Sequence, residues 1–257
     1  MELIDTHCHL TFEHLADDIE AVLARSVFAG VTGWLTVGTD PQQNRKAVEL
    51  AWKYKNIYAA VGIHPHDAHD VTAHTLTELK ELAQREKVVA LGETGLDFHY
   101  NLSSPSDQKQ AFTAQLKIAK ELNLPVIIHC REAFDETMEI LYQHGLDIRG
   151  VVFHCFSGSA EQAKIVLDHG FYISFTGVVT FINADLIRKA AKIVPTDRLM
   201  LETDCPYMSP EPMRKQKTNE PALMIHTAKY LAELKQMDLT DFADAVTTTS
   251  KNFFDLH

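Results

Sequence analysis

No apolar run in the sequence is long enough to cross a membrane. The most hydrophobic segments, such as residues 124–129 and 151–156, are far shorter than the roughly 20 residues that a transmembrane helix needs. The N-terminus also lacks the basic region and apolar stretch of a secretory signal. We therefore expect a cytoplasmic protein that does not bind membranes.

Positive charge is scarce as well. The chain has 24 Lys and Arg residues against 35 Asp and Glu residues, which gives a formal net charge of −11. This balance argues against the broad basic face that most nucleic-acid-binding proteins use. Two divalent cations in a pocket would change the charge locally, because a bound cation dominates the field at its site. An enzyme with a metal centre and an anionic substrate is therefore compatible with the composition.

Cysteine is limited to four residues, and the sequence has no Cys-x-x-Cys pair. This argues against a sulfur-rich zinc site or a redox pair. Linkers rich in Pro, Gly or Ser, blocks of charge and low-complexity runs are missing too. A chain of 257 residues that is 46% hydrophobic can bury a substantial core, and single barrels often have this length. We expect a single domain over residues 1–257.

Short β-branched or apolar runs alternate with helical patterns along the chain. Eight runs are present, at residues 3–6, 33–37, 58–62, 88–92, 126–129, 150–154, 172–175 and 199–202. A helix predicted over 108–122 follows Ser104 and Pro105, which suit a helix start, and two more follow the last run. This alternation is typical of parallel βαβ units, so we predict an α/β fold, a (β/α)8 TIM barrel. The alternative is an open doubly wound sheet, but no glycine-rich nucleotide motif follows the first run.

Residues that commonly bind metals stand at the ends of five predicted strands. They are His7, His9, Glu93, His129, His154 and Asp204. The carboxyl ends of barrel strands converge on one mouth, so these side chains should meet there. Side chains alternate between the two faces of a strand, so His7 and His9 point the same way and can hold one cation. Imidazoles with carboxylates are a recognised ligand set, and we predict a metal centre.

The sequence around these residues resembles one known family. Six segments carry the likeness: DTHCH at 5–9, GIHP at 62–65, GETGLD at 92–97, HCR at 129–131, HCFSG at 154–158 and ETD at 202–204. They closely resemble, in the same order, the TatD family of metal-dependent deoxyribonucleases, which belongs to the amidohydrolase-like barrels. The resemblance implies two divalent cations, one held by His7, His9 and Asp204, the other by His129 and His154, with Glu93 as a bridge. Many related barrels use a carboxylated lysine there, so Glu93 favours the TatD branch.

The resemblance also implies hydrolysis of phosphodiester bonds in nucleic acid, with single-stranded or short DNA as the expected substrate. Divalent cations lower the pKa of water and neutralise charge on phosphoryl oxygens. Asp204 would accept the proton of the attacking water, and Glu93 is the second catalytic carboxylate. Arg131 and His64 would contact the phosphate; the alternatives are an ion pair of Arg131 with Glu132 or another carboxylate and a loop contact for His64. The ligands suit zinc, manganese, cobalt or nickel, and the resemblance admits magnesium.

Two other functions stand beside this one. With the same metals the chain could attack a carbonyl group, as an amidohydrolase, a lactonase or an aminoacyl-tRNA deacylase, and the acidic charge favours this alternative. The third is a barrel that keeps its ligands for stability or serves as a scaffold, which predicts a closed coordination shell. The sequence does not distinguish exonuclease from endonuclease action, and it leaves the oligomeric state open.

Overall fold

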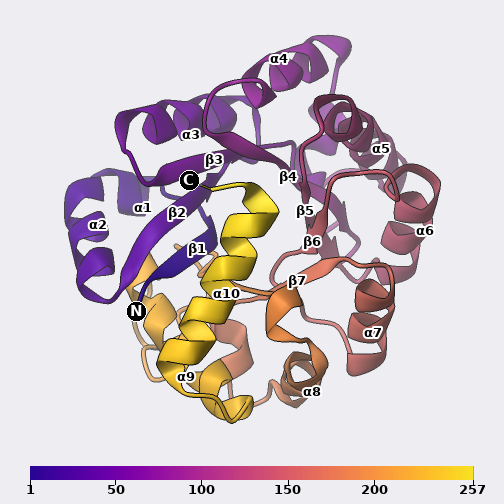
Figure 1. The fold of residues 1–257 in the computed structure, drawn as a ribbon. Helices are drawn as coiled ribbons and strands as arrows, with labels where there is room; N and C mark the ends of the chain where they lie inside the picture. Colours follow the sequence, from indigo (N-terminus) through magenta and orange to yellow (C-terminus); the bar gives the residue numbers. More distant parts are fainter. Residues whose placement is uncertain (257) are drawn as a thin grey trace. The chain divides into compact units, whose positions relative to one another are not determined.

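The computed structural model describes residues 1–256, and its strands follow the predicted alternation. Eight parallel strands form one sheet in the order β1 to β8, the order of a (β/α)8 barrel (Figure 1). They are β1 (Leu3–Cys8), β2 (Val31–Val37), β3 (Ile57–Val61), β4 (Val88–Asp97), β5 (Val126–Arg131), β6 (Val151–Phe153), β7 (Tyr172–Phe175) and β8 (Leu199–Leu201). The predicted fold class is confirmed.

Helices connect successive strands, and the last two helices follow β8. They are α1 (Glu13–Ala16), α2 (Ile19–Phe28), α3 (Pro41–Lys53), α4 (Ala73–Ala83), α5 (Pro105–Leu122), α6 (Phe134–His144), α7 (Ala160–Asp168), α8 (Asp185–Ile193), α9 (Met224–Leu234) and α10 (Leu239–Phe254), with 3-10 turns η1 (Pro65–Asp70), η2 (Gly177–Thr180), η3 (Thr196–Arg198) and η4 (Pro221–Leu223). Helix α5 begins as predicted, since the Ser104 hydroxyl accepts the N–H of Asp107 and Pro105 stands in the first turn. Within residues 1–256, no helix combines the length and the apolar composition that a membrane span requires.

The chain divides into two compact units. One comprises Met1–Thr36 and the chain from Cys155 onward, and the other comprises Val37–His154. The first unit holds β7, β8, β1 and nearly all of β2, and the second holds β3 to β6. The single domain expected over residues 1–257 stays a prediction.

In the first unit, β8 lies beside β1. The Thr6 hydroxyl donates to the carbonyl of Leu201 at 2.9 Å, and the N–H of Asp204 donates to the carbonyl of His7 at 2.9 Å. Helix α10 packs against both strands (Figure 1). Leu3 of β1 and Leu201 of β8 are buried, and each buried leucine contributes about 2 kcal/mol by leaving water. This packing brings the end of β8 next to the end of β1.

In the second unit, β4 runs past its predicted end at residue 92 and continues to Asp97. Gly95 pairs with His129 of β5, and its φ angle of +140° is one that side-chain-bearing residues rarely adopt. A Cβ atom at Gly95 would lie 2.0 Å from the carbonyl oxygen of His129. Only glycine therefore permits β4 and β5 to approach this closely, and the approach brings Glu93 near His129.

Three buried amide side chains brace the strand ends of the second unit. Each accepts the N–H and donates to the C=O of a single residue, at 2.8–3.0 Å: Asn44 of α3 with Gly62, Gln115 of α5 with Ile63, and Gln108 of α5 with Asp97. Backbone groups in the interior need such partners wherever a strand leaves its ladder. The amides therefore fix the backbone beside His64 and at Asp97.

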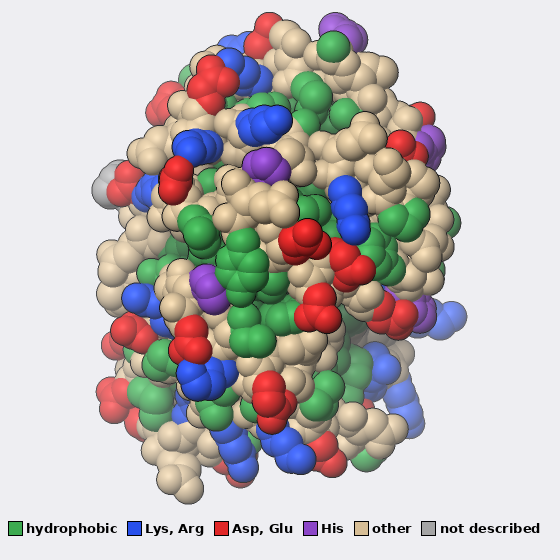
Figure 2. All heavy atoms as spheres, turned by 90° about the vertical axis from the view of Figure 1, so that its right-hand side faces the viewer, with side chains coloured by type: hydrophobic (Ala, Val, Ile, Leu, Met, Phe, Trp, Pro, Cys, Tyr) green, Lys and Arg blue, Asp and Glu red, His purple; other side chains and the backbone are tan. Residues whose placement is uncertain are grey.

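The surface view agrees with the composition. On the face that Figure 2 shows, Lys and Arg side chains are interspersed with Asp and Glu. This face carries no broad basic patch, as the net charge of −11 predicts.

Candidate metal centre

The first unit brings His7, His9 and Asp204 together. The Nε2 atom of His9 lies 3.3 Å from Oδ1 of Asp204, and that of His7 lies 3.7 Å from the same oxygen. All three residues are buried, and one ligand atom from each lies within 4.8 Å of the others. Two imidazoles and a carboxylate at this spacing fit a divalent transition metal. We call these residues the first cluster.

Asp5 holds the backbone that carries Asp204. Its carboxylate accepts the N–H of Thr203 at 2.9 Å and the Thr203 hydroxyl at 2.6 Å. Burial raises the pKa of Asp5 to about 7, although the bonds from Thr203 oppose this shift. On the other side, the amide of Asn219 donates to the carbonyls of Thr203 and Tyr207. The turn that follows β8 is thereby fixed at both ends.

The second unit gathers three imidazoles around Glu93. Its Oε1 atom lies 2.7 Å from Nδ1 of His129, 2.8 Å from Nε2 of His154 and 3.5 Å from Nε2 of His64. Burial alone would raise the pKa of Glu93, but His154, His64 and His129 outweigh it and hold the pKa well below its ordinary value. The carboxylate is therefore ionised and ready to bind a cation. We call Glu93, His129 and His154 the second cluster.

Asp97 orients His129. The Nε2 atom of His129 lies 3.0 Å from Oδ2 of Asp97, so Nε2 carries the proton and Nδ1 faces Glu93. Burial would raise the pKa of Asp97, yet the bonds from His129 and from the N–H of Tyr100 lower it overall. Burial would likewise lower the pKa of His129, but Asp97 and Glu93 raise it. A carboxylate behind a histidine in this way is the usual outer support of a metal ligand.

His64 lies beside the second cluster in a different protonation state. Its Nδ1 atom accepts the N–H of His66 at 3.1 Å, and burial lowers its pKa to about 4, so the ring is neutral with its proton on Nε2. This Nε2 faces Glu93 and His129. In this tautomer His64 is a hydrogen-bond donor, as the predicted contact with a phosphate oxygen requires, and with Glu93 and His129 it also forms a group that could hold a cation.

Arg131, the other predicted phosphate contact, lies at the end of β5. Its guanidinium carbon is 4.7 Å from the centre of the Tyr100 ring. The carboxylate of Glu132 contacts Nδ1 of His99 at 2.7 Å instead. The alternative ion pair between Arg131 and Glu132 does not form within residues 1–256.

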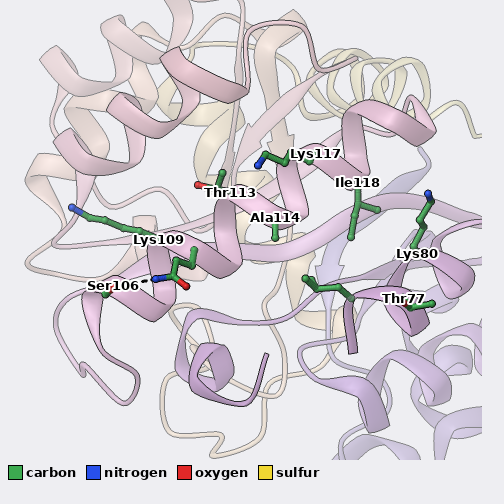
Figure 3. Close-up of a pocket in the computed structure, with 10 residues that line it drawn as sticks. Thr77, Lys80, Ser106, Lys109, Thr113, Ala114, Lys117 and Ile118 are labelled. Atoms are coloured by element: carbon green, nitrogen blue, oxygen red, sulfur yellow. Dashed lines mark hydrogen bonds between the residues drawn. The ribbon is translucent and has the colours of Figure 1, made fainter. Parts of the chain in front are cut away.

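The six predicted ligands thus lie in the two clusters, one in each unit. The joining of the clusters into one centre, with Glu93 as the bridge, stays a prediction. Asp97, Asp5 and the buried amides are supports that the sequence did not identify. For Gln108 and Gln115, polar residues on the inner face of α5 were the available signal. A groove of about 780 Å³ between α4 and α5 includes none of the ligands; its walls carry Lys80, Lys109 and Lys117 (Figure 3).

Known proteins resemble the chain over its full length. A family model described as TatD-related DNase matches residues 4–255. The metal-dependent hydrolase YabD of Bacillus subtilis is 43% identical over 98% of both chains, and the 3'-5' ssDNA/RNA exonuclease TatD of Escherichia coli is 36% identical over 98% of both. Among solved structures, the TatD homologue YjjV of Escherichia coli has a TM-score of 0.93, with 32% identity over 99% of this chain and 98% of that one. The chain therefore belongs to the family of TatD-related DNases.

Proposed function

We propose that this protein is a metal-dependent phosphodiesterase that cleaves single-stranded or short DNA. One observation carries the proposal: buried imidazoles surround a buried carboxylate twice, at Asp204 just beyond the carboxyl end of β8 and at Glu93 in the half of β4 toward its carboxyl end. Active sites of (β/α)8 barrels are built at these ends. The name of the Escherichia coli relative, a 3'-5' ssDNA/RNA exonuclease, supports nucleic acid as the substrate and makes RNA a second one to test.

His7, His9 and Asp204 would hold one divalent cation, and His129 and His154 would hold another, with Glu93 shared. Bound cations would lower the pKa of a water molecule and neutralise charge on the phosphoryl oxygens. Zinc, manganese, cobalt, nickel and magnesium are the candidates. We also propose that the protein acts in the cytoplasm.

Three residues of the chain would carry out the other steps of the reaction. Asp204 would accept the proton of the attacking water and later pass it to the leaving oxygen, because a carboxylate among the metal ligands stands next to that water. His64 donates from Nε2 to a phosphoryl oxygen, and its low pKa keeps that role constant at neutral pH. Arg131 binds a neighbouring phosphate with its remaining donors.

The test is a metal add-back assay. Protein stripped with EDTA receives zinc, manganese, cobalt, nickel or magnesium singly, and each preparation is offered single-stranded DNA, duplex DNA, RNA, misacylated tRNA, an amide and a lactone. We expect cleavage of single-stranded DNA with at least one metal and none without metal. Cleavage confined to the amide, the lactone or the misacylated tRNA would instead establish the carbonyl alternative. Failure on every substrate with metal bound would favour a structural site.

A further inference from the structure

A group of aromatic and cationic side chains, most of them exposed, stands beside the second cluster. Tyr100 follows β4 and is 54% exposed. The guanidinium of Arg131 lies over its ring, and the rings of His66 and His99 meet it nearly at right angles, at centre distances of 5.5 and 4.8 Å. We call Tyr100, Arg131, His66 and His99 the rim group.

Tyr100 is held in place although its ring is exposed. Its backbone N–H donates to Oδ1 of Asp97 at 2.9 Å, and so does that of His99 at 3.0 Å. The other oxygen of Asp97 accepts from His129 and contacts Nε2 of His66 at 3.1 Å. A single buried carboxylate therefore fixes both the orientation of His129 and the position of Tyr100.

Burial does not explain this placement. More than half of Tyr100 faces solvent, so the ring adds little to the hydrophobic stabilisation of the fold. The rim group is nevertheless ordered around the ring, with His66 between Tyr100 and His129: the centres of His66 and His129 are 6.2 Å apart. A fixed, exposed aromatic ring next to a reactive site is the usual form of a stacking surface.

The chemistry of the rim group matches a nucleobase. Bases stack on tyrosine rings and on guanidinium planes, and the sequence of the strand matters little because every base has such a face. Arg131 adds positive charge, which suits a strand that carries a phosphate at each nucleotide. Inside a duplex these faces are covered by neighbouring pairs, so the group can accept only an unpaired base.

We propose that Tyr100, with Arg131 against its ring, is the stacking platform for the nucleobase next to the scissile phosphate. The proposal rests on the phosphodiesterase function proposed above and adds the residues that would hold an unpaired base of the substrate. Asp97 serves as a positioning residue, because its carboxylate holds the backbone of Tyr100 and the ring of His129 in fixed positions relative to each other.

The experiment compares a short oligothymidylate with an abasic oligonucleotide of the same length. Wild type, Tyr100→Ala, Tyr100→Phe and Tyr142→Ala are assayed with manganese for KM and kcat. Binding of the labelled oligothymidylate to metal-stripped protein is measured by fluorescence anisotropy. Tyr142 lies on α6, is 45% exposed and is outside both clusters and the rim group, so its variant is the matched control.

We expect Tyr100→Ala to weaken binding of oligothymidylate about tenfold, the effect of one lost base stack. Its KM for oligothymidylate should rise by the same factor, whereas cleavage of the abasic chain should stay as in wild type. Tyr100→Phe keeps the ring and should resemble wild type, as should Tyr142→Ala. An unchanged preference of Tyr100→Ala for the chain with bases would overturn the platform. If wild type cleaves neither chain, the phosphodiesterase function fails, and the anisotropy measurement alone decides the platform.

Discussion

The Nε2 atom of His129 donates to Oδ2 of Asp97 at 3.0 Å. This bond decides which ring nitrogen is available to a cation, because a proton on Nε2 leaves the lone pair of His129 for Nδ1. Nδ1 lies 2.7 Å from Glu93, and the pKa of His129 is raised. Below this raised pKa the Nδ1 atom also carries a proton, which a cation must displace, so metal affinity should fall as the pH falls.

Replacing Asp97 by Asn should weaken metal binding 10- to 100-fold, the range found when an outer carboxylate is removed. The substituted amide would present its N–H₂ group where Oδ2 now lies, or would leave Nε2 of His129 without an anionic acceptor. His129 would then favour the tautomer with its proton on Nδ1. Isothermal titration of metal-stripped protein with zinc or manganese measures the change. Asp147→Asn, which alters only an exposed pair with Lys120, is the control; equal affinities in the two variants would contradict the role of Asp97.

Replacing Asp204 by Asn should abolish turnover while the protein stays folded. The amide keeps the shape of the side chain, so the bond from the backbone N–H at this position to His7 survives. It cannot accept a proton, and general base catalysis is worth about 10²- to 10⁴-fold in rate. Steady-state cleavage of single-stranded DNA and thermal unfolding by circular dichroism are measured together. Full activity in a folded variant would remove Asp204 from the mechanism.

Most of what the sequence predicted concerns the ends of strands. Apolar runs show where the chain becomes a strand, and a parallel barrel puts the next polar residue of each run at one mouth. This is why the six ligands could be expected at one mouth before their distances were known, whereas the grouping of Asp204 with His7 and His9 was implied by the family resemblance. The predicted ligands lie within a few residues of the ends of the predicted runs. Errors of a few residues in strand length therefore did not change which residues were predicted as ligands.

The role of Asp97 could not be predicted from the sequence. The predicted run ended at Gly92, whereas β4 continues to Asp97 because Gly95 permits close pairing with β5. The carboxylate of Asp97 caps the turn after β4 by accepting the N–H groups of His99 and Tyr100. Its bond to His129 joins residues 32 positions apart, and only the fold brings them together. Gln108 and Gln115 escaped notice for the same reason.

Gly95→Ala should disturb the second cluster strongly. A methyl group 2.0 Å from the carbonyl oxygen of His129 cannot be accommodated without moving β4 or β5, so we expect a loss of at least about 3 kcal/mol in the free energy of unfolding. Gly170→Ala is the matched control: its φ angle is +75° but its Cβ would meet nothing within 4 Å, so only about 1 kcal/mol of backbone strain applies. Urea unfolding and zinc titration measure both effects. Comparable losses in the two variants would show that close strand approach is not what Gly95 provides.

Asp5 should make the stability of the EDTA-treated protein depend on pH. Its pKa is about 7 in the folded chain against an ordinary value of 3.8, so the folded state holds this proton more tightly than the unfolded state. The contribution of Asp5 to the free energy of unfolding is therefore greatest below about pH 4. It falls by at most about 1.4 kcal/mol per pH unit as the pH rises to about 7, and above that pH it no longer changes. Asp5→Asn cannot ionise and keeps partners for Thr203, so its advantage over wild type should grow between these limits. Urea unfolding of EDTA-treated protein at several pH values measures the difference, with the exposed Asp70→Asn as control. A constant difference between Asp5→Asn and wild type from pH 4 to 7 would show that Asp5 is already ionised in the fold.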